Sequence, residues 1–100
     1  MAKVKLMYDH GPGKGKAYGF VCPGCGEIHQ FWERYDDGKP GWKWNGDFEK
    51  PMVHPSVKVT TKFPDRTDIC HSFITNGRIQ FLGDCTHALK GQTVELPDID

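Results

Sequence analysis

The sequence predicts a mostly β fold, a small single domain of antiparallel hairpins spanning residues 1–100. Glycines and prolines are scattered along the chain as turn punctuation, and short runs of alternating apolar and polar residues lie between them. No long segment has the 3.6-residue period of an amphipathic helix, so we expect at most one short helix. A chain of 100 residues buries only a small core, which a bound ion would help to stabilise.

Three strands are expected in the first third of the chain. Apolar residues alternate with lysines over residues 3–8, a second strand follows at 17–22, and residues 28–34 are rich in β-branched and aromatic side chains. Residues 9–16 separate the first two strands. Because they are rich in glycine and lysine, they are predicted to form a flexible surface loop.

Two Asn-Gly pairs predict hairpins, because both residues tolerate the positive φ angles of a type I′ turn. Asn45-Gly46 directly follows an alternating run at residues 42–44. Asn76-Gly77 is flanked by two stronger strands, 68–75 and 78–83. The second hairpin is the best-defined element of the prediction.

Shorter elements complete the predicted fold. A strand over residues 57–63 is entered through the Pro55-Ser56 step, and residues 93–96 add an edge strand. Asp84 suits the N-cap position of a short helical turn at residues 86–90.

The cysteines carry the sharpest local signal in the chain. Cys22 and Cys25 belong to the motif CPGCG, whose glycines permit the tight turn that aims two thiolates at one tetrahedral ion. With Asn76-Gly77 as a two-residue turn, the other two cysteines become diagonal neighbours on one face of the hairpin's open end. Four thiolates would then form a site like that of a zinc ribbon. The predicted zinc ligands are Cys22, Cys25, Cys70 and Cys85.

Histidines leave the fourth ligand open. His71 and His87 each lie within two residues of a predicted ligand, and either replaces Cys85 if the second hairpin strand breaks early. His29 follows the first cysteine pair closely enough to be another candidate. Mixed thiolate and imidazole ligands favour zinc. A redox motif is disfavoured because nothing helical follows Cys25, and disulfides are disfavoured because no export signal is expected.

The opposite face of the same hairpin carries a polar group. His71 and Asp84 are diagonal neighbours there, close enough for a carboxylate to orient an imidazole. Together with His87 or His54 they supply the parts of a second metal site or of an acid–base pair. The alternative is structural: Asp84 caps the following turn, and His71 hydrogen-bonds locally or supports a zinc ligand.

Aromatic residues and lysines are the candidate contacts to nucleic acid. Trp42 and Trp44 project from one face of their strand, with Trp32 nearby in sequence, and stacked rings beside basic residues can hold single strands. The alternative is that the tryptophans form the core of a small β domain. The basic residues of the first segment are Lys3, Lys5, Lys14 and Lys16.

Composition argues against several partners. Lysine and arginine total 13 and acidic residues 13, so the net charge of zero gives no overall attraction to nucleic acid or acidic membranes. No window approaches the roughly 18 apolar residues of a membrane span, and the N-terminus lacks the apolar core of a signal peptide. We expect a cytoplasmic protein with no membrane partner.

Five motifs occur in a fixed order: CPGCG at residue 22, WKWNGD at 42, Pro55-Ser56, CHSFI at 70 and GDCTHAL at 83. This order resembles a family of small uncharacterised proteins from tailed phages, prophages and bacteria. The resemblance covers roughly residues 18–97 and implies a zinc-binding, β-rich domain. Some members carry the label ammonia monooxygenase, which does not suit a 100-residue chain without a membrane span.

More distant bacterial relatives keep the paired cysteines, the Pro-Ser step and a Cys…His element that matches Cys70 and His71. They lack the element around Cys85 and His87. The resemblance therefore implies Cys22, Cys25 and Cys70 as the ligands that transfer most directly.

These observations together predict a small phage-type zinc-binding protein, a non-catalytic accessory module that binds a host macromolecule in the bacterial cytoplasm. The expected partner is a host protein because the net charge is zero, with nucleic acid second. One alternative is a zinc-dependent hydrolase that uses His71, Asp84 and His87 at an open coordination position. Another is thiol redox chemistry through Cys22 and Cys25.

Overall fold

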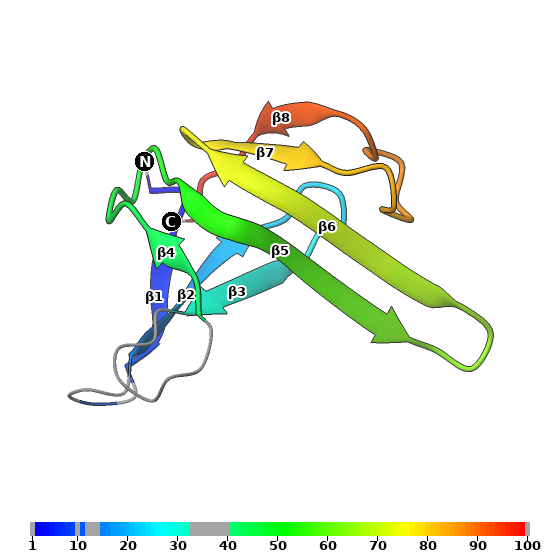
Figure 1. The fold of residues 1–100 in the computed structure, drawn as a ribbon, viewed down its shortest axis with the longest axis horizontal. Coiled ribbons are helices and arrows are strands. Elements are labelled where there is room, and N and C mark those ends of the chain that lie inside the picture. Colours follow the sequence, from blue (N-terminus) through cyan, green and yellow to red (C-terminus); the bar gives the residue numbers. More distant parts are fainter. Residues whose placement is uncertain (1, 10, 12–14, 33–40, 100) are drawn as a thin grey trace.

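The computed structural model describes residues 2–9, 11, 15–32 and 41–99, which form two antiparallel sheets and no helix (Figure 1). The predicted loop at residues 9–16 and the end of the predicted strand at 28–34 lie partly outside the described residues. In the described part of the chain, no helix is long and apolar enough to cross a membrane. The mostly β prediction is confirmed.

The strands divide between the sheets in chain order. The smaller sheet has the order β1-β2-β3, and the larger has the order β4-β5-β6-β7-β8. The smaller sheet contains β1 (Lys5–Asp9), β2 (Lys16–Val21) and β3 (Ile28–Trp32); the larger contains β4 (Lys43–Trp44), β5 (Val53–Lys62), β6 (Thr67–Thr75), β7 (Arg78–Phe81) and β8 (Thr93–Glu95).

The core lies between the two sheets. Phe20 and Phe31 of the smaller sheet belong to one buried cluster with Ile74, Ile79 and Phe81 of the larger sheet. Trp42 and Trp44 are partly buried and pack against this cluster. The tryptophans therefore contribute to the core, as one of their two interpretations proposed.

The hairpin of β6 and β7 is confirmed in turn type and in register. Asn76 and Gly77 have φ angles of 52° and 77°, as a type I′ turn requires. Thr75 pairs with Arg78, and the pairing continues to Ser72 with Phe81. However, β7 ends at Phe81 and not at residue 83, so the predicted register does not reach the open end of the hairpin.

Two local predictions differ from the structure in their turns. β4 and β5 form the expected antiparallel hairpin, but Asn45-Gly46 is not its two-residue turn, because β4 pairs with His54 and Val53 and residues 45–52 form the connection. Asn45 acts there through its side chain, whose Oδ1 accepts the Met52 N–H at 3.1 Å. Residues 86–90 form successive turns instead of a helical segment, and the chain reverses at Gly91, whose φ is 77°.

Strand β5 begins four residues earlier than predicted and contains a wide bulge. Val53 pairs with Ile74 and Val57 with Ser72, so residues 54–56 lie opposite Phe73 alone. The His54-Pro55 peptide bond within the bulge is cis. Beyond the bulge, β5 and β6 form a long two-stranded arm that projects past the rest of the molecule (Figure 1). β8 lies at the edge of its sheet, as predicted.

Candidate functional site

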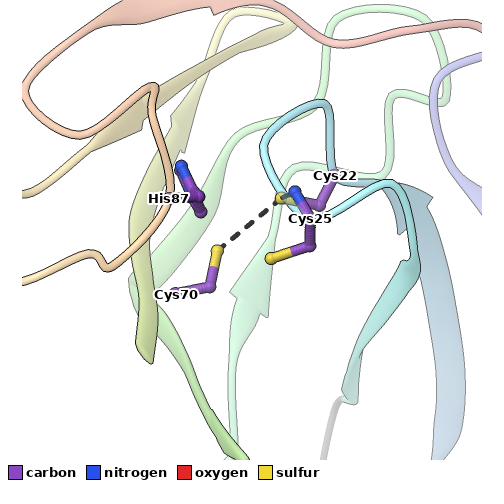
Figure 2. A group of neighbouring side chains, drawn as sticks. All are labelled: Cys22, Cys25, Cys70 and His87. Atoms are coloured by element: carbon purple, nitrogen blue, oxygen red, sulfur yellow. Dashed lines mark hydrogen bonds between the residues drawn. The ribbon is translucent and has the colours of Figure 1, made fainter. Parts of the chain in front are cut away.

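Three cysteines and one histidine converge between the sheets. The ligand atoms of Cys22, Cys25, Cys70 and His87 all lie within 4.8 Å of one another. Figure 2 shows their three sources: the turn between β2 and β3 carries the first two, β6 carries Cys70, and the segment after β7 carries His87. Residues far apart in the sequence therefore form one compact donor set.

Local geometry explains how the first turn presents its thiols. The Cys22 N–H donates to the Glu27 carbonyl and the Gly26 N–H donates to the Cys22 carbonyl, both at 2.8 Å. The Cys25 N–H points at the Cys22 Sγ, 3.4 Å away. A Cβ atom at Gly24 would lie within 2.6 Å of three ring atoms of His87. Glycine at this position is therefore what lets the His87 imidazole approach the turn.

The three thiols are electrostatically coupled. Cys22 Sγ and Cys70 Sγ are 3.6 Å apart, and the Cys70 thiol together with a weaker hydrogen bond from His29 lowers the pKa of Cys22 to about 3. Burial and the nearby charge of Cys22 raise the pKa of Cys25 to about 11. The hydrogen bond to Cys22 and burial also raise the pKa of Cys70. Cys22 is therefore the thiol of the three that loses its proton most readily, and a cation among the sulfurs would balance that charge.

The donor set fits a tetrahedral metal ion. Two sulfurs that each lie about 2.3 Å from a tetrahedral zinc ion are about 3.8 Å apart, close to the 3.6 Å between Cys22 and Cys70. The Nε2 atom of His87 is buried, and no hydrogen-bond partner for it exists among the described residues. On the other side of that ring, Leu89 donates its N–H to Nδ1 at 3.2 Å. These four residues lie close enough to bind a metal ion.

Cys85 lies outside this group. The His71 N–H donates to Cys85 Sγ, and the thiol points at the His71 carbonyl, both at 3.2 Å. Because the strand pairing stops at Phe81, the chain turns before Cys85 can reach the position that the extended register predicted. His87, the alternative fourth ligand, joins the group in its place. His29 is buried beside Cys22.

A second polar group lies on the opposite face of β6. His71 Nε2 is 2.7 Å from Ser56 Oγ, and His71 Nδ1 is 3.1 Å from Asp84 Oδ2. The imidazole therefore bridges a hydroxyl and a carboxylate through its two ring nitrogens. The His71 side chain is 23% exposed and the Asp84 side chain 43% exposed, so the group is open to solvent.

The bulge in β5 and the turn after β7 bring these three residues together. The bulge lies directly before Val57 and contains Ser56, whose hydroxyl contacts His71. Bulges are common beside active sites. Leu82 donates its N–H to the His71 carbonyl at 2.9 Å and thereby starts the turn that carries Asp84. The predicted proximity of His71 and Asp84 is observed, whereas His87 belongs to the cysteine group.

Ser56 is not among the site residues predicted from the sequence. The Pro55-Ser56 step is predicted there as the entrance to a strand and as one of the motifs that carry the family resemblance, and nothing in the pattern of residues 53–57 indicates a bulge. A usable signal was present nevertheless: Ser56 and Ser72 are the only two serines in the chain. Ser72 is 1% exposed on the inner face of β6, and its Oγ has no hydrogen-bond partner among the described residues.

Comparison with known families gives one match. Residues 2–82 match the family described as the bacterial ubiquitination-like system serine protease, BubE. The chain belongs to this family. The matched region contains Ser56 and His71, and it ends two residues before Asp84. No curated protein and no solved structure matches the chain.

Membership in the BubE family corrects the expected function. A non-catalytic accessory module is not what a family described as a serine protease contains, so that prediction is wrong. The zinc-dependent hydrolase fails as well, because its nucleophile would be a metal-bound water and not a serine. The predicted resemblance to a small bacterial family is confirmed, because residues 2–82 match one.

Proposed function

We propose that the chain is a serine peptidase in which Ser56 is the nucleophile, His71 the general base and Asp84 the residue that orients His71. One observation carries the proposal: a single imidazole contacts a serine hydroxyl at 2.7 Å and a carboxylate at 3.1 Å. In the serine-protease triad, a general base contacts the nucleophile and an acid orients the base. This arrangement occurs on unrelated folds. The other serine of the chain, Ser72, is buried on the inner face of β6.

The proposed reaction follows from the roles of these three groups. Ser56 Oγ attacks the carbonyl carbon of the scissile bond while His71 Nε2 takes the hydroxyl proton. The imidazolium gives that proton to the leaving amine, the C–N bond breaks, and an acyl ester remains on Ser56. Water then attacks the ester and gives a proton to His71, which returns it to Ser56 as the carboxylic acid leaves.

Asp84 supports both steps without exchanging a proton. Its carboxylate accepts the Nδ1–H of His71, which keeps the Nε2 lone pair directed at Ser56 and stabilises the imidazolium. The description of the family supports a protein substrate within a ubiquitination-like system.

We further propose that Cys22, Cys25, Cys70 and His87 bind zinc in a structural role. Three thiolates and one imidazole fill a tetrahedral shell, which leaves no position for a catalytic water. Mixed sulfur and nitrogen ligands favour zinc among the common divalent ions. When bound, the ion supplies a cross-link between the two sheets whose binding free energy adds to the free energy of unfolding.

The test of the triad is hydrolysis of a denatured protein substrate, such as reduced casein, by the zinc-loaded protein. Wild type should cleave it, Ser56→Ala should not, and the matched control Ser72→Ala should retain activity. Equal cleavage by wild type and Ser56→Ala would overturn the assignment, as would complete loss in Ser72→Ala with its fold intact.

A further inference from the structure

The triad is aligned across the strands of the larger sheet. Asp84 follows β7, His71 lies on β6 and Ser56 on β5, which are neighbours in the order β5-β6-β7. A carbonyl carbon must reach Ser56 Oγ from the side that His71 does not occupy. The side of Ser56 away from β6, along the outer edge of β5, is one from which a substrate can reach Ser56 Oγ without meeting His71.

Most of that edge has no partner strand in the described part of the chain. β4 pairs with β5 only at Val53 and His54, whereas the pairing of β5 with β6 continues from Val57 to Lys62. Figure 1 shows β4 beside the start of β5 and the long arm extending beyond it. The open edge thus begins next to Ser56 and continues toward the tip of the arm.

Hydrogen bonding in β6 identifies the backbone groups that face the open edge. The carbonyls of His71 and Ile69 accept N–H groups of Leu82 and Thr86, so these odd-numbered residues direct their backbone groups away from β5. The even-numbered residues Cys70 and Ser72 therefore bond to β5, opposite Val59 and Val57.

It follows that the intervening residues of β5 point the other way. Lys58 and Thr60 direct their N–H and C=O groups outward, and both residues are exposed. Such a row of backbone donors and acceptors is a template onto which an extended peptide can add as a strand.

We propose that the substrate binds as an extended polypeptide strand, antiparallel to β5, whose residues upstream of the scissile bond pair with Lys58 and Thr60. This inference rests on the proposed function. An antiparallel strand approaching Ser56 along the arm runs from the Lys62 end toward the bulge, so its scissile carbonyl arrives at Ser56 last. Antiparallel pairing is also the slightly more stable arrangement per residue.

The edge of β5 on the N-terminal side of Ser56 is already occupied by β4. The Trp42 Nε1–H donates to the Ser56 carbonyl at 3.2 Å, and β4 occupies the edge from His54 onward. Residues downstream of the scissile bond therefore leave the sheet at this point and gain no strand pairing. Specificity accordingly resides in the segment upstream of the cleaved bond.

The test compares two covalent inhibitors by residue-resolved hydrogen exchange. Diisopropyl fluorophosphate carries no peptide, whereas a mixed library of tetrapeptidyl diphenyl phosphonates carries four upstream residues of varied sequence. Both should modify Ser56, and only the peptidyl adducts should slow exchange at the Lys58 and Thr60 amides, by about tenfold or more. Modification of Ser56 by both reagents with unchanged exchange at these amides would overturn the inference.

A backbone substitution gives an independent test. Thr60→Pro removes one outward N–H without removing a bond to β6, and proline is tolerated at this kind of edge position. It should slow modification by the peptidyl phosphonates about tenfold relative to the control Thr60→Ala, while diisopropyl fluorophosphate reacts equally with both. Equal rates for the peptidyl reagents would contradict strand pairing. Failure of every reagent to modify wild-type Ser56 would instead refute the proposed function.

Discussion

Consecutive residues of β6 serve two different groups on its two faces. Cys70 points inward, where it is 3% exposed and joins two cysteines and His87 between the sheets. His71 points outward, where it joins Ser56 and Asp84 in contact with solvent. The inner group buries Cys22 and Cys70, leaves Cys25 exposed, and has the four donors that suit a structural ion. The outer group is accessible and suits a reaction with a polypeptide, so alternation along one strand separates the two roles.

The two groups nevertheless depend on the same pair of segments. Besides β6, each uses the turn after β7, which supplies Asp84 to the outer group and His87 to the inner group. Backbone and side-chain bonds together hold this turn to β6. Leu82 and Thr86 donate their N–H groups to the carbonyls of His71 and Ile69, both at 2.9 Å. Cys85 Sγ contacts both backbone groups of His71, and Thr86 Oγ1 accepts the Ile69 N–H at 3.0 Å. A metal ion joining Cys70 to His87 would therefore also fix Asp84 relative to His71.

The largest expected effect is a loss of activity without a loss of stability, because the variant changes only the outer group. Ser56→Ala should lower kcat by about 10⁶-fold, the scale seen when a serine-protease nucleophile is removed. Its melting temperature should stay within about 2 °C of wild type, because Ser56 lies on the solvent-facing side of the sheet. Calorimetry and a peptidase assay on one preparation measure both quantities. A large loss of stability would mean that the outer group is part of the structural framework.

The second largest expected effect is the loss of activity when the Asp84 carboxylate is replaced by an amide. Asp84→Asn should lower kcat by about 10⁴-fold, because an amide favours the wrong tautomer of His71. Zinc content should remain equal to that of wild type, since His87 is unchanged. The matched control is Asp68→Asn on β6, which removes an exposed carboxylate paired with Arg66 and should leave activity intact. A fully active Asp84→Asn protein would remove Asp84 from the proposed mechanism.

Metal removal should affect both faces together. Chelation withdraws a cross-link between the sheets and should lower the melting temperature by more than about 10 °C. Activity should fall in parallel, because Asp84 is released along with His87, and one equivalent of zinc should restore both. Metal analysis with thermal denaturation and activity measurements checks this. Activity that persists in a stable, metal-free protein would show that the two groups are independent.

The smallest expected effect concerns Cys85, which lies between Asp84 of the outer group and His87 of the inner group. Cys85→Ala removes the thiol that contacts the His71 backbone and should cost about 1–2 kcal/mol of stability. Because the metal group does not include this thiol, zinc stoichiometry should not change. The contrasting variant Cys70→Ala should lose zinc. Reduced zinc binding in Cys85→Ala would indicate that Cys85 is a ligand after all.

Local patterns predicted the fold better than the site. The turn at Asn76-Gly77 fixes the hairpin register through residues that act on their immediate neighbours, and this gave the inward direction of Cys70 and the outward direction of His71. The choice between Cys85 and His87 could not be predicted in this way. It depends on where β7 stops, and on the space that Gly24 leaves for the His87 ring from across the molecule.

The serine was missed for a similar reason. A bulge of three residues opposite Phe73 has no distinct signature in the sequence, so the position of Ser56 relative to His71 does not follow from a strand pattern alone. The proposed function could not be deduced from the sequence either. A cysteine motif is conspicuous in a sequence, whereas Ser56, His71 and Asp84 come from three elements and meet only when those elements pack.

The proposed role of Ser56 as a nucleophile activated by His71 and Asp84 can be tested on the intact protein. The most direct measurement is mass-spectrometric localisation of the adduct formed by a fluorophosphonate on the zinc-loaded protein. We expect one adduct on Ser56 and none on Ser72. Labelling should be at least a hundredfold slower in His71→Ala, since the general base contributes about 10²–10⁴-fold. Absence of an adduct on Ser56, or labelling at an unchanged rate without His71, would contradict the proposed role.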